Sequence, residues 1–237
     1  MPLRFAFDDP QAFRGRCDVS QAAVCPPGAL YEPGAVAPAG GWRPIAQASA
    51  GALRWRPGDP YDALVEIVRP LPPAAGPLEA LADGLGDPSA HYLGQALSAP
   101  GLPTTTDNYR DGRLIGLHLD NWDKLQYADK PRGRRRLALN LGPGDRFLIV
   151  GDATAQDVCR AAHADYSHRY PHTDDIRAWS AAGRPLTCYR IRLAPGEGYI
   201  APTEYLPHDG STEGQADGSA IAFWLGHWAP GALSSLV

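Results

Sequence analysis

The chain has 237 residues, a formal net charge of −4 and 44% hydrophobic residues. These values are ordinary for a globular protein, so they exclude a fully disordered chain and favour a single compact domain over residues 1–237. The acidic balance gives no electrostatic attraction to nucleic acid or to an anionic membrane surface. The 26 Gly and 24 Pro residues argue against a helical bundle and favour a β-rich fold with many loops.

The four cysteines form no CxxC pair and no zinc-finger spacing; they are Cys17, Cys25, Cys159 and Cys188. The start of the sequence lacks the apolar core of a signal peptide, and no stretch approaches the roughly 18 apolar residues of a membrane span. We therefore expect a cytoplasmic protein with reduced thiols and no membrane partner.

The N-terminal part, about 1–105, predicts a flank rich in loops and helices. Turn-forming clusters interrupt residues 1–60 and leave room for a short strand at 52–56. The run 59–71 fits a short helix or a buried strand, and its periodicity does not choose between them. Residues 77–97 predict one or two helices with a break between 84 and 88.

From residue 113 the pattern changes to short β-like segments separated by turn signals. The expected strands cover 113–120, 135–142, 146–152, 186–202 (two strands and a turn) and 219–228, with helical stretches inside 153–182. The fold class is therefore mainly β with flanking helices (α+β), built as a β-sandwich or small open barrel whose core spans about 106–228.

Three residues form a candidate metal site. His118 and Asp120 stand two apart in a predicted strand, so both side chains project from one face and can bind one ion. A third ligand is available from His208, which follows the segment 186–202. Two imidazoles and one carboxylate leave metal positions open for substrate, oxygen or a cosubstrate, the arrangement of non-haem Fe(II) oxygenases.

The order HxD…H and the strings GLHLDNWDKL, RRLALNLGPGDRFLIV and YIAPTEYLPHDGST resemble a bacterial branch of the Fe(II)- and 2-oxoglutarate-dependent dioxygenase superfamily, over roughly residues 100–228. The resemblance implies a double-stranded β-helix (jelly-roll, cupin-like) core with His118, Asp120 and His208 as metal ligands. It further implies Fe(II) as cofactor, 2-oxoglutarate and O2 as cosubstrates, and a small-molecule substrate such as an amino acid or a natural-product intermediate. A homo-oligomer is left open.

The sequence departs from the family pattern at the 2-oxoglutarate anchor. Many members carry an Arg or Lys on the strand after the distal histidine, yet no Arg or Lys follows His208 here. We expect Arg146 to replace it, because a guanidinium binds a carboxylate through two hydrogen bonds. Asn140 and Thr212 or Ser211 could add neutral hydrogen bonds. The competing cations are Arg113, Arg136, Arg190 and Arg192.

Other interpretations remain. His227 is the rival distal ligand, although its place in the FWLGHW segment favours a packing role. His163, His168 and His172 fit a solvated loop better than a second metal site. The missing late basic residue favours a cupin-like metalloenzyme that does not use 2-oxoglutarate, and a non-catalytic small-ligand binding protein with a vestigial site is the third possibility.

Overall fold

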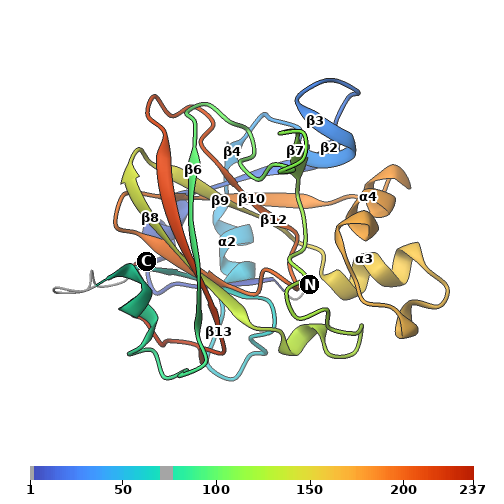
Figure 1. Ribbon diagram of the computed structural model, residues 1–237. Coiled ribbons are helices and arrows are strands. Elements are labelled where there is room, and N and C mark those ends of the chain that lie inside the picture. The colour runs from blue at the N-terminus through green and yellow to red at the C-terminus, as the bar shows by residue number, and fades with distance from the viewer. Residues whose placement is uncertain (1–2, 70–76) are drawn as a thin grey trace.

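The computed structural model describes residues 3–69 and 77–237 and consists mainly of β-strands (Figure 1). The first sheet has six strands in the order β1-β5-β11-β8-β13-β6. In that order the strands are β1 (Arg4–Ala6), β5 (Leu64–Val68), β11 (Gly198–Ala201), β8 (Arg135–Pro143), β13 (Ser219–Gly226) and β6 (His91–Ser98). The prediction of a mainly β fold is confirmed.

The second sheet has seven strands, in the order β12-β9-β10-β2-β3-β7 with β4 paired to β2. These strands are β12 (His208–Ser211), β9 (Arg146–Gly151), β10 (Thr187–Leu193), β2 (Cys17–Val24), β3 (Tyr31–Pro38), β7 (Leu114–Gly116) and β4 (Arg43–Pro44). The segment after β7 bridges back to β12 through His118 and His208. This sheet is therefore a nearly closed, barrel-like structure, and its two ends meet at two candidate metal ligands.

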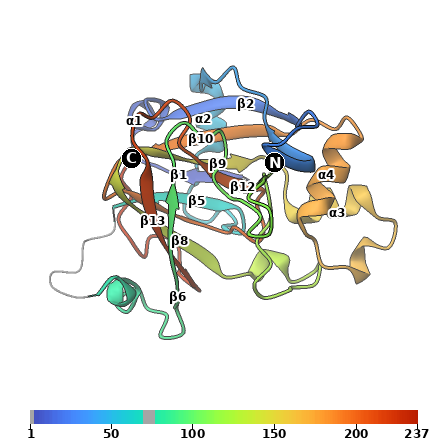
Figure 2. The same cartoon turned by 45° about the horizontal axis from the view of Figure 1, so that its top comes forward.

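The helices are short, and α3 and α4 lie to one side of the strands (Figure 2). They are α1 (Pro10–Arg14), α2 (Gln47–Leu53), α3 (Ala155–Ala162) and α4 (Thr173–Ala181), with the 3-10 turns η1 (Leu78–Ala82), η2 (Lys130–Arg132) and η3 (Tyr166–His168). Helices α3 and α4 pack against each other on one side of the molecule, as Figures 1 and 2 show. No helix in residues 3–69 and 77–237 has both the length and the apolar character that crossing a membrane requires.

Strand β8 separates two apolar clusters because its side chains alternate between the faces of the sheet. Ala138 faces the main core, which both sheets line. Leu137 and Leu139 face the other way and pack with Trp224 and Trp228 in a second cluster. The even-numbered side chains of β8 therefore point between the sheets, and Arg136 shares that direction.

The N-terminal part differs from its prediction. It contributes strands to both sheets, and β2 pairs with β10 although more than 160 positions separate Gln21 from Thr187. The predicted strand at 52–56 is wrong, because α2 extends to Leu53 and Arg54 forms only an isolated bridge to Phe5.

The two ambiguous or helical segments before residue 100 also resolve into strands. The run 59–71 contains the fully buried strand β5, while positions 70 and 71 lie outside the described residues. In 77–97 only η1 is helical. The predicted second helix is wrong, because residues 91–98 form β6 and pair along β13. Pairing with a distant strand outweighs the local helical pattern.

Candidate metal centre

Two distant segments meet at the candidate metal centre. The predicted strand over 113–120 ends at Gly116 in β7, so the placement of His118 and Asp120 in a strand is wrong. His118 forms an isolated bridge to His208, the first residue of β12, and Asp120 lies in irregular chain. The backbones of His118 and His208 exchange two hydrogen bonds, with N to O distances of 3.1 and 3.0 Å. This exchange fixes the two histidines side by side.

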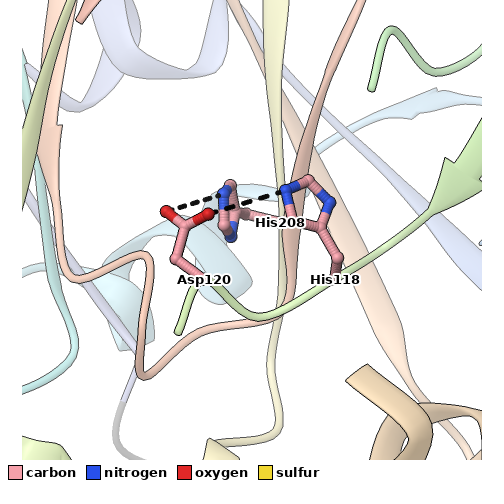
Figure 3. A group of neighbouring side chains, drawn as sticks. All are labelled: His118, Asp120 and His208. Atoms are coloured by element: carbon pink, nitrogen blue, oxygen red, sulfur yellow. Dashed lines mark ion pairs between the residues drawn. The ribbon is translucent and has the colours of Figure 1, made fainter. Parts of the chain in front are cut away.

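The three side chains converge on one point (Figure 3). Their ligand atoms lie within 4.8 Å of one another. Nε2 of His118 is 3.9 Å from Oδ1 of Asp120, and Nε2 of His208 is 3.7 Å from Oδ2 of the same carboxylate. The group is buried, and it could hold a metal ion.

Each histidine is oriented by a backbone carbonyl two positions earlier. Nδ1 of His118 lies 3.0 Å from the oxygen of Gly116, and Nδ1 of His208 lies 3.1 Å from that of Leu206. A carbonyl only accepts, so Nδ1 carries the proton and the lone pair of Nε2 points to the centre. Burial also lowers the pKa of His208 to about 3, so its ring is neutral near pH 7.

The electrostatics of the group fit a divalent cation. Burial opposes ionisation of Asp120, but the charge of Arg136, 2.6 Å from Oδ2, holds the pKa of Asp120 below its usual value. Nε2 of His208 is buried without a hydrogen-bond partner among the described residues, whereas Oδ2 of Asp120 has Arg136 beside it. A buried acceptor without a donor is costly, and a metal ion would satisfy Nε2 of His208.

A small cavity of about 30 Å³ adjoins the group. Its lining includes His118, His208, Arg136, Arg146, Tyr199 and Phe223. The arginines on β8 and β9 both reach it, and so does the buried carboxyl group of Asp209.

Arg146 is the least satisfied cation of this cavity. It is 3% exposed, and its hydrogen bonds run to two hydroxyls, Oγ of Ser219 at 3.3 Å and Oγ1 of Thr105 at 3.5 Å. Among the described residues it forms no ion pair with a carboxylate, and burial lowers its pKa. Gly210 makes room for it, since a Cβ there would lie 2.6 Å from Nη2 of Arg146. A buried guanidinium in this state is suited to an anionic ligand.

The competing arginines all have carboxylate partners. Arg136 pairs with Asp120 as described above. The remaining pairs are Arg113 with Asp111, Arg190 with Asp18 and Glu213, and Arg192 with Asp145. Of the five arginines that the sequence singled out, Arg146 is therefore the one with no carboxylate partner in the described parts of the chain.

Asn140 and Thr212 do not line this cavity. The Asn140 amide bonds to the turn after β8, with Nδ2 3.0 Å from the oxygen of Gly144. Oγ1 of Thr212 lies 2.7 Å from the oxygen of Ala99 and accepts from the backbone N–H of Leu102. The hydrogen bonds of both side chains therefore connect neighbouring chain segments and do not point into the cavity.

The other histidines lie away from the centre. His227 is exposed and donates its backbone N–H to Asp87, and it is not part of the three-residue group. His163 pairs with Asp175, and His172 caps the start of α4.

Sequence reasoning missed Asp209, a buried neighbour of the centre. Its Oδ1 accepts hydrogen bonds from the backbone N–H groups of Thr105 and Thr106, which line the cavity. Burial raises the pKa of Asp209. Its position directly after His208 was the available signal, but nothing in the sequence indicated contact with residues 105 and 106.

No protein-family model matches the chain, and no curated protein is similar to it. The chemistry of the site therefore carries the functional assignment.

Proposed function

We propose that this protein is an Fe(II)- and 2-oxoglutarate-dependent oxygenase that hydroxylates or otherwise oxidises a small molecule. The observation that carries the proposal is the buried His118, Asp120 and His208 group beside Arg146, which forms no ion pair within residues 3–69 and 77–237. In a hydroxylation of this class, a substrate C–H bond, O2 and 2-oxoglutarate give a C–OH bond, succinate and CO2.

The path of the chain supports a double-stranded β-helix. From β6 to β13 the chain passes repeatedly between the two sheets: β6, β8, β11 and β13 lie in the first, and β7, β9, β10 and β12 lie in the second. Such alternation is what winding two strands together into a β-helix produces. In the resembling superfamily this core carries an HxD…H group, here His118, Asp120 and His208.

The three residues would bind iron and leave further metal positions open. Bound iron would supply the chemistry that activates oxygen. The residues of this chain would orient it: the carbonyls of Gly116 and Leu206 fix the two imidazoles, and Arg136 balances the charge of Asp120.

Arg146 would bind the far carboxylate of 2-oxoglutarate. A buried cation without a counter-ion is costly, so a dianion beside it is stabilised by the same charge. Thr105 and Ser219 already contact this guanidinium and would keep it directed at the cavity.

The test is anaerobic reconstitution of the full chain with Fe(II), followed by 2-oxoglutarate. We expect a weak visible charge-transfer band, and succinate once oxygen and a substrate are supplied. The His208→Ala variant should show neither, while His227→Ala should behave as wild type. Absence of the band from wild-type protein, together with no succinate from any substrate, would contradict the proposal.

A second candidate is a cupin-like metalloenzyme that does not use 2-oxoglutarate. The size of the cavity favours it, because about 30 Å³ has room for about two waters, and a five-carbon dicarboxylate needs lining side chains such as Phe223 to move. Iron uptake without any 2-oxoglutarate-dependent band would select this candidate.

A further inference from the structure

A buried lysine lies next to the loop that carries Asp120. Lys130, in η2, is 0% exposed. Its Nζ lies 3.3 Å from Oε2 of Glu204 and 3.1 Å from Oδ1 of Asn121. Burial lowers the pKa of Lys130, and the charge of Glu204 opposes that change. The ammonium is thus held by two oxygens, one of them on the residue after Asp120.

Glu204 also contacts the loop that carries Asp120. It is buried in the turn between β11 and β12, four positions before His208. Its second oxygen, Oε1, accepts the backbone N–H of Asp123 at 2.9 Å. The residue before it, Thr203, accepts the backbone N–H of Asp120 at 3.0 Å. The turn therefore contacts the loop directly at two positions, Asp120 and Asp123. Lys130 connects Glu204 to a third position of the loop, Asn121.

The energetics favour a role in position over a role in stability alone. A buried ion pair gains little net free energy because desolvation offsets the attraction, although breaking one partner is costly. For comparison, Arg132, two residues after Lys130, forms an exposed pair with Asp129. Its Nη1 lies 3.8 Å from Oδ1 of Asp129, and the arginine side chain is 84% exposed. Such surface pairs contribute about 0–1 kcal/mol.

We propose that Lys130, Glu204 and Asn121 are positioning residues that hold the 120–123 loop against the turn before His208, and so set the separation of Asp120 from His208. The inference rests on the metal-binding part of the proposed function. It does not depend on 2-oxoglutarate or on the substrate.

Metal affinity tests the inference in the full chain. We would titrate Co²⁺ into wild type, Lys130→Met, Asn121→Ala and the matched control Arg132→Gln, following the visible Co²⁺ spectrum. Loss of an outer hydrogen-bond partner of a metal ligand costs about ten- to a hundredfold in affinity. Lys130 and Asn121 act on Asp120 through the loop and not by direct contact, so for the first two variants we expect an increase in Kd at the lower end of this range, about tenfold. Arg132→Gln should match wild type.

Asn121→Ala separates positioning from stability, because it leaves the Lys130–Glu204 pair in place and remains informative if Lys130→Met does not fold. A folded Asn121→Ala variant with wild-type Co²⁺ affinity and spectrum would overturn the inference. Hydrogen exchange of residues 118–124 gives a readout that needs no metal: exchange should be faster in Asn121→Ala than in Arg132→Gln, and equal exchange would also overturn it. Wild-type protein that takes up no metal would instead contradict the proposed function.

Discussion

Two buried arginines, Arg135 and Arg146, are 4% and 3% exposed but have opposite surroundings. Arg135 has Nη1 2.6 Å from Oε2 of Glu66, and its guanidinium also donates to the backbone oxygens of Leu64, Ile200 and Trp228. Arg146 contacts two hydroxyls and a cavity. A buried cation whose Nη1 and Nη2 are both occupied by protein acceptors, as in Arg135, is part of the framework, whereas one left with weak partners beside a cavity is available to a ligand.

The comparison predicts that replacing Arg135 changes the stability of the fold, whereas replacing Arg146 changes ligand binding. Removing a cation from the framework leaves its carboxylate buried and uncompensated, so the free energy of unfolding should fall. Removing the cation beside the cavity breaks no ion pair among the described residues, so ligand binding should change while most of the stability is kept.

The largest expected effect is on metal binding, which should be lost in variants of the metal ligands and kept in a variant of Arg135. His118→Ala and Asp120→Ala each remove one of three ligands, so metal content after reconstitution should fall to background while circular dichroism stays native. Arg135→Met, where folded, should retain the metal. Full metal content in Asp120→Ala would remove this residue from the ligand set.

Next in size is the effect of Arg146→Met on 2-oxoglutarate. Loss of a charge-assisted contact worth roughly 1.5–4 kcal/mol raises the required 2-oxoglutarate concentration about ten- to a thousandfold. Urea unfolding should change by less than about 1 kcal/mol, since Arg146 forms no ion pair in the described parts of the chain and Asp209 beside it keeps its hydrogen bonds to Thr105 and Thr106. Arg192→Met, which breaks an exposed pair with Asp145, is the matched control. Unchanged 2-oxoglutarate dependence with metal bound would move the anchor elsewhere.

For Arg135→Met the comparison predicts the reverse outcome. The variant leaves Glu66 buried without its cation, so the free energy of unfolding should fall by about 3–5 kcal/mol. Adding Glu66→Gln should recover part of the loss, because the uncompensated charge is then gone. Equal stability of Arg135→Met and wild type in urea would erase the distinction between the two arginines.

The smallest effect concerns pH and a second framework cluster. Glu197 is buried, which by itself raises its pKa, but hydrogen bonds from Arg16, the Ala194 N–H and Arg69 hold the pKa below its usual value. A lowered pKa stabilises the fold above the unfolded value and is lost as pH falls through the folded value. Wild type should therefore lose about 1 kcal/mol more than Glu197→Gln between pH 6 and pH 3 in urea titrations. Parallel curves would contradict this.

From the sequence, most strands after residue 113 could be predicted, but few of the strands before it. Alternation in β8 and β9 is local, and it placed both strands correctly. Among the described residues, strand β6 pairs only with β13, more than 100 positions away, and β2 reaches the second half of the chain only through β10, so local patterns gave little signal for these pairings. The HxD spacing indicated His118 and Asp120, but the choice of Arg146 over its competitors depends on which arginines have carboxylate partners.

The same limit applies to neutral side chains near the site. Asn140 and Thr212 were plausible ligand contacts by sequence position, yet their hydrogen bonds to Gly144 and Ala99 depend on how turns pack in three dimensions. Lys130 gave no signal at all, because a lysine in a polar turn is normally exposed.

The bridge between His118 and His208 also bears on how the protein folds. These residues are 90 positions apart, and pairing across so long a loop carries a large closure entropy that slows folding. During synthesis, β1 to β11 all precede β12, so the centre cannot assemble until after these strands have been made. Metal uptake during refolding would accordingly report when these two distant segments come together.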